Sequence, residues 1–133
     1  MQTVLIIALS LHVLAAVFWA GGTFVMARGA ADGRRLAKPM LGAALVTLLS
    51  GGYLWHALHG AAFGKPETVL VVGIGCALLA FVLQAGGGAI ARAQMKRGAL
   101  ALDGAKLRMA KIQRIAAPLL ALTIVCMAAA RYA

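Results

Sequence analysis

Four long apolar runs constrain the fold of this chain more than any other feature. A helix needs about 20 apolar residues to cross the hydrocarbon core of a bilayer, and each run is long enough. The runs cover residues 3–27, 40–60, 67–91 and 109–131. We therefore predict an all-α integral membrane protein, with one transmembrane domain over residues 1–133 built as a four-helix bundle.

The composition supports a lipid environment. Hydrophobic residues make up 63% of the chain, whereas soluble domains contain roughly 45–50% apolar residues. The sequence also contains 16 glycines, and small residues allow transmembrane helices to pack closely. We therefore expect the lipid bilayer to be the principal partner of the protein.

The distribution of positive charge predicts the topology. The net charge is +10, with four basic residues in 28–38 and seven in 92–114, whereas the connection between the second and third runs has only Lys65 and Glu67. Basic connections are retained in the cytoplasm, so both termini are predicted to lie outside, in the periplasm if this is a bacterial inner membrane. We expect no nucleic-acid binding, because no aromatic residues alternate with the charges to stack on bases.

The connection in 92–114 also allows two local structures. Leu100, Leu102, Leu107 and Met109 alternate with basic residues, which is compatible with an amphipathic helix on the inner leaflet. We expect instead a solvated loop followed by a frayed fourth helix.

Polar and small side chains predict which helix faces point inward, because lipid penalises exposed polar groups. His12, Trp19 and Met26 recur every seven residues and therefore share one face of the first helix. Small residues repeat at helical spacing in the third run, where Gln84 is the single amide. These faces are predicted to form the bundle interior.

The histidines are the best candidates for chemistry. The sequence contains no paired carboxylates, phosphate loop, serine–histidine–aspartate set or H-E-x-x-H motif. An imidazole within the membrane can instead ligate a metal, and a helical bundle lined by small residues can enclose haem b. We predict electron transfer or redox chemistry, with His12 and His56 as axial ligands and Met127 as an alternative second ligand. The remaining cofactor-binding candidates surround the haem. Trp19 would wall the haem pocket, Gly22 and Gly52 would allow close approach, and Arg131 would lie at the outer rim near the haem propionates.

Three alternatives stay open at this point. Copper could bind His12, His56 and Met127, with a weaker contribution from His59, because imidazole and thioether ligands suit Cu(I). The chain could instead be a cofactor-free subunit of a larger membrane complex, in which His12 bonds a backbone carbonyl or the Gln84 amide. A redox partner, or a homodimer that shares the cofactor, is also compatible with so few ligands in one chain.

Short motifs add a resemblance to known proteins. The stretch "LHVLAAVFWAGGTF" resembles the first helix of the copper-resistance protein D (CopD) domain and of HemJ-type protoporphyrinogen oxidases, and "LLSGGYLW" is similar to the start of their second block. The resemblance implies a four-helix scaffold with His12 as a haem ligand, as in the HemJ type, or copper uptake, as in CopD. HemJ-type proteins carry a lysine within a later span that this sequence lacks, so protoporphyrinogen oxidation is not implied.

Overall fold

The computed structural model describes residues 2–29, 33–59, 63–98 and 101–132. Within them the chain forms helices α1 (Gln2–Ala27), α2 (Gly33–Leu58), α3 (Lys65–Lys96) and α4 (Leu102–Ala130). All four are long and apolar enough to cross a membrane. The prediction of an all-α bundle with four spanning helices is confirmed, and the chain is a multi-pass membrane protein.

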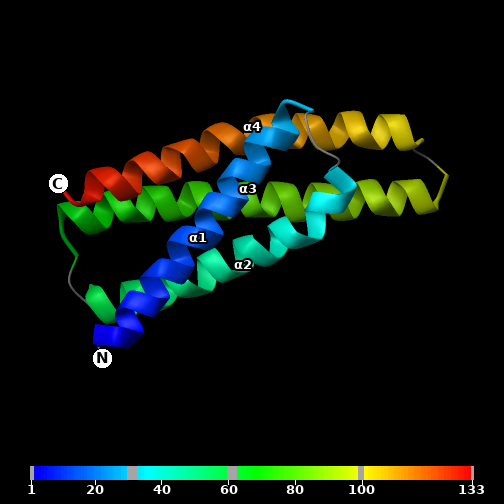
Figure 1. The fold of residues 1–133 in the computed structure, drawn as a ribbon. Coiled ribbons are helices and arrows are strands. Elements are labelled where there is room, and N and C mark those ends of the chain that lie inside the picture. The colour runs from blue at the N-terminus through cyan, green and yellow to red at the C-terminus, as the bar shows by residue number, and fades with distance from the viewer. Residues whose placement is uncertain (1, 30–32, 60–62, 99–100, 133) are drawn as a thin grey trace.

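The helices run alternately up and down and pack as two antiparallel pairs (Figure 1). The α3–α4 pair is the most extensive, and α1 with α2 forms the second pair. Helix α1 also crosses α4, whereas α2 only touches α3 and α4. Both chain ends lie at the end of the bundle where α2 leads into α3 (Figure 1). The opposite end carries the basic residues.

At the basic end the helices extend further than predicted. Helix α3 continues to Lys96 and α4 begins at Leu102, seven residues before the predicted start of the fourth span. The expectation of a solvated loop is therefore wrong. Hydropathy reports apolar stretches, whereas the helical hydrogen bonding of α3 and α4 continues into the polar residues beyond them. The two helices contact each other there and in the adjoining part of the pair. Gly87 faces Ile112, Gly88 faces Met109, and Arg108 donates to the Gln94 amide oxygen.

The predicted interior faces of α1 and α3 are confirmed. His12, Trp19 and Met26 are all buried on α1. The buried residues of α3 form the small-residue stripe around the one amide: Gly73, Ala77, Ala80, Gln84, Gly88 and Ala91. Large apolar side chains such as Leu14 and Leu49 point outward instead, as expected for helices that face lipid.

Some charged residues of the basic end are outside the described part of the chain. Asp32 lies outside the described residues, and so do the side chains of Arg34, Arg35 and Asp103. The described cations at this end are Arg28, Lys38, Arg92, Lys96, Arg97, Lys106, Arg108, Lys111 and Arg114, and all are exposed.

Candidate functional site

His12 is held between the two helices of the first pair. It lies on α1 and is 8% exposed. Its Nδ1 atom lies 2.9 Å from the Thr47 carbonyl oxygen and 3.0 Å from Ser50 Oγ, both on α2. Because a carbonyl oxygen only accepts, Nδ1 carries the proton and donates to Thr47. The Ser50 hydroxyl donates in turn to the Val46 carbonyl at 2.6 Å.

This arrangement fixes which ring nitrogen of His12 can act as a ligand. A neutral imidazole protonated at Nδ1 has a lone pair on Nε2. Nε2 makes no hydrogen bond to the described residues. Every fully buried polar side-chain atom among those residues has a hydrogen-bond partner, so an atom without one is at least partly exposed. Nε2 is therefore not sealed inside the protein. Ligating histidines typically donate their other N–H to a carbonyl or carboxylate in this way.

A glycine on α2 allows the imidazole to approach the backbone. A Cβ atom at Gly51 would lie only 3.0 Å from His12 Cε1. Gly52 is exposed and has open space where its Cβ would be. His12 therefore approaches α2 at Gly51 and not at Gly52, the glycine singled out from the sequence. On α1, Gly22 has a different neighbour, because its Cβ would lie 2.9 Å from Met40 Sδ.

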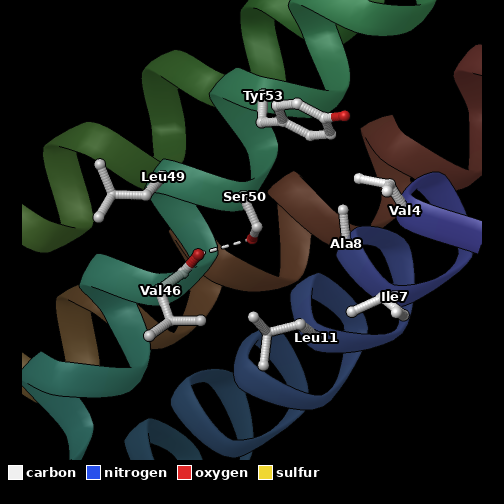
Figure 2. Close-up of a pocket in the computed structure, with 8 residues that line it drawn as sticks. All are labelled: Val4, Ile7, Ala8, Leu11, Val46, Leu49, Ser50 and Tyr53. Carbon is white, nitrogen blue, oxygen red and sulfur yellow. Dashed lines mark hydrogen bonds between the residues drawn. The ribbon is translucent and has the colours of Figure 1, made fainter. Parts of the chain in front are cut away.

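An apolar groove of about 470 Å³ runs between α1 and α2 next to His12. Figure 2 shows Leu11, Ile7, Ala8 and Val4 on one wall. The opposite wall is formed by Val46, Leu49, Ser50 and Tyr53 (Figure 2). Ser50 belongs both to this wall and to the hydrogen bonds of His12. The groove therefore reaches the Nδ1 side of the imidazole.

Trp19 anchors a second polar cluster deeper in the bundle. Its indole N–H donates to Gln84 Oε1 at 2.6 Å, which orients the amide of Gln84. The amide nitrogen then donates to Thr23 Oγ1 at 2.8 Å and to Gln113 Oε1 at 2.7 Å. Thr23 donates to the Trp19 carbonyl at 2.8 Å. These bonds join α1, α3 and α4 through satisfied polar groups.

The structure does not bring His56 to His12. His56 follows Gly51 by five residues, which is about 7.5 Å along α2 and about 140° around its axis. Its side chain is exposed. His12 therefore meets α2 through Thr47, Ser50 and Gly51.

The other predicted ligands belong to different segments of the chain, since His59 follows α2 whereas Met127 and Arg131 are at the end of α4. His59 Nδ1 donates to Glu67 Oε1 at 2.8 Å, and the His59 ring stacks against Trp55. Met127 is half-buried on α4, and Arg131 is exposed at the C-terminal cap of that helix. The described residues contain no group of three or more histidine, cysteine or acidic side chains that could hold a metal ion. His12 is the candidate ligand with the best-defined surroundings.

A bond from His12 to a backbone carbonyl is the arrangement expected above for a cofactor-free subunit, and the structure has such a bond to Thr47. The sequence does not indicate which residues of α2 supply the partners. Thr47 takes part through its backbone carbonyl oxygen, which gives no sequence signal. Ser50 is three residues further on and next to Gly51, so these polar and small residues lie on one side of α2. Gln113 was missed because it lies near the basic stretch, where an amide has no need to be buried. No protein family, curated protein or solved structure matches this chain.

Proposed function

We propose that this protein binds haem b within the membrane and acts in electron transfer, with His12 as an axial ligand. The observation that carries the proposal is the hydrogen bond from His12 Nδ1 to the Thr47 carbonyl. It holds the ring in one tautomer and leaves the Nε2 lone pair for iron. A buried, oriented histidine within a spanning helix is a functional-site candidate by default.

The residues around His12 fit a ligand of this kind. Gly51 lets the ring lie close to α2, and Ser50 accepts from the same Nδ1–H, so the imidazole has little freedom to rotate. The adjoining apolar groove reaches the Nδ1 side of the ring, so a macrocycle held through Nε2 would lie outside that groove. When bound, haem would supply reversible one-electron chemistry at iron. The protein would supply the imidazole, its orientation and an environment without water.

One chain supplies one well-placed imidazole for this site. His56 is exposed on α2, where it is accessible to a second chain rather than to His12. We propose that His12 would hold the haem either as the only ligand or together with a residue of another chain. If His12 is the only ligand, small molecules such as cyanide should bind the haem-loaded protein readily. If a second chain contributes a ligand, the amount of haem bound should follow the oligomeric state.

The basic end supports an orientation in the membrane. Since nine exposed cations gather at the ends of α1 and α3 and the starts of α2 and α4, this end is proposed to face the cytoplasm. Both termini would then be outside, in the periplasm for a bacterial inner membrane. His12 lies ten residues after the start of α1, about 15 Å along the helix, and would sit in the outer half of the bilayer.

The test is a haemin titration of the purified protein in a mild detergent, followed by a reduced-minus-oxidised spectrum. We expect one haem per site with sharp Soret and α bands, and loss of at least tenfold in affinity for His12→Ala. His59→Ala is the matched control, because His59 is held by Glu67, and it should bind haem like the wild type. Equal binding by all three proteins, or a colourless protein with stoichiometric copper, would overturn the proposal.

A further inference from the structure

Three cations gather where α1 ends against α4. Arg114 of α4 donates from Nε to the carbonyl oxygen of Ala27, the last residue of α1, at 3.3 Å. Arg28 follows Ala27 directly, and Lys111 precedes Arg114 by three residues, so it lies on the same side of α4. We call Arg28, Lys111 and Arg114 the basic corner. Figure 1 shows α1 meeting α4 at this point.

The positive charge of the basic corner is not neutralised by the described part of the protein. All three side chains are exposed. The ion pair found among the described residues is that of His59 and Glu67, at the opposite end of the bundle. Arg114 contacts Ala27 through Nε. The two terminal nitrogens of the Arg114 guanidinium make no hydrogen bond to the described residues.

Helix lengths place the basic corner at the edge of the hydrocarbon core. Helix α3 has 32 residues, which corresponds to about 48 Å, whereas the core is roughly 30 Å thick. Gln84 of α3 bonds Thr23 and Gln113, so the end of α1 is level with the region just after Gln84. That region lies about 20 residues into α3, which is about 30 Å at 1.5 Å per residue. This length matches the thickness of the hydrocarbon core, so α1 ends near the edge of the core.

An apolar side chain lies beside the cations. Ile115 follows Arg114 on α4 and is 57% exposed. It is on the side of the corner nearer the bilayer centre, since α4 runs inward from Lys111 to Thr123. A cationic group above an exposed apolar residue matches a phospholipid, which has an anionic phosphate above its acyl chains.

We infer that the basic corner binds the headgroup of an anionic phospholipid. The guanidinium groups of Arg28 and Arg114 and the ammonium of Lys111 would contact the phosphate, and the acyl chains would lie along Ile115. Arginine donors suit phosphate because their planar fork can form two parallel hydrogen bonds. The lipid would fix the crossing of α1 over α4.

The remaining cations of the α3–α4 pair provide a matched control. Lys96, Arg97 and Lys106 are exposed and lie beyond the end of α1. They have the same total charge as the basic corner. If only the overall positive charge mattered, removing either set would have the same effect.

The experiment compares thermal unfolding and lipid retention of the full chain in nanodiscs of phosphatidylcholine, with and without phosphatidylglycerol. For the wild type, phosphatidylglycerol should raise the midpoint by roughly 5 °C and remain bound in native mass spectrometry. The R28Q/K111Q/R114Q variant should lose this shift, whereas K96Q/R97Q/K106Q should keep it. R28Q/K111Q retains the Arg114–Ala27 contact and should lose most of the shift, which separates lipid binding from a defect in folding.

Four outcomes would overturn the inference. In the first, the midpoint does not depend on phosphatidylglycerol. In the second, the two triple variants lose the shift equally. In the third, inorganic phosphate added to phosphatidylcholine nanodiscs reproduces the shift, so the corner binds a free anion. In the fourth, a single-stranded oligonucleotide reproduces it, so the corner binds polyanions in general.

Discussion

Trp19 donates its indole N–H to Gln84 across 2.6 Å and thereby joins α1 to α3. In the described residues no Cα atoms of these two helices approach within 8 Å, so long side chains bridge the gap. Phe81 of α3 adds an edge-to-face contact with the Trp19 ring. Between α1 and α3 the bundle is therefore held by side-chain contacts rather than by close backbone packing.

Removing the Gln84 amide should destabilise the bundle. Gln84→Leu leaves the Trp19 indole N–H and the side-chain oxygen Oε1 of Gln113 without their partner. We expect a loss of about 1–2 kcal/mol in the free energy of unfolding. Gln94→Leu is the control, because Gln94 bonds Arg108 near the tip of the α3–α4 pair. Unfolding by SDS in detergent micelles measures both. Equal losses would show that the network has no special role.

Gly73 is a point of close approach between α3 and α4. A Cβ there would lie 3.0 Å from Cys126 Cβ and 3.4 Å from the Thr123 carbonyl oxygen. Gly73→Ala should therefore cost about 1–3 kcal/mol, because the helices must move apart. Gly75 has open space at the same place, and Gly75→Ala should be neutral or slightly stabilising. The same SDS titration distinguishes the two, and a neutral Gly73→Ala would contradict this packing.

The neighbouring glycines Gly51 and Gly52 allow a similar comparison at His12. Gly51→Ala would push against His12 Cε1, whereas Gly52→Ala meets nothing within 4 Å. We expect Gly51→Ala to be less stable than Gly52→Ala by about 1–2 kcal/mol. Its affinity for haemin should also fall, because the imidazole is displaced from Thr47. If the two variants match in stability and in binding, His12 does not depend on this contact.

Glu67, in the first turn of α3, is bonded to His59 just after α2 and to Gly64 just before α3. Its carboxylate accepts from the Gly64 N–H at 2.8 Å and from His59 Nδ1 at 2.8 Å. Glu67→Ala removes both bonds, and His59→Ala removes one, so the thermal midpoint should fall further for Glu67→Ala. His56→Ala is the control and should leave the midpoint unchanged, since His56 is exposed. A larger drop for His59→Ala than for Glu67→Ala would contradict this account of Glu67.

The sequence was sufficient to predict the number of helices and the inward faces of α1 and α3. The repeat of His12, Trp19 and Met26 and the burial of Gln84 follow from the cost of polar groups in lipid. Helix ends were less predictable, because the stretches of α3 and α4 beyond the membrane are polar. The packing of α3 on α4 sets those ends, and hydropathy does not report it.

The predicted pairing of His12 with His56 failed for a different reason. Depth along a helix can be estimated from the sequence, but the rotation of α2 against α1 cannot. That rotation is set by close contacts such as Gly22 with Met40 and Gly51 with His12. It places Thr47 and Ser50 beside His12 and leaves His56 on the outside.

The most direct test of the central claim is chemical rescue of the His12 site. We expect His12→Gly to lose the haem spectrum of the wild type and to regain it when free imidazole is added, because the small molecule takes the place of the missing side chain. Gly21→Ala is a control with open space around it and should keep the wild-type spectrum without imidazole. An unchanged spectrum in His12→Gly before imidazole is added, or no haem bound by the wild type, would contradict the claim that His12 ligates haem.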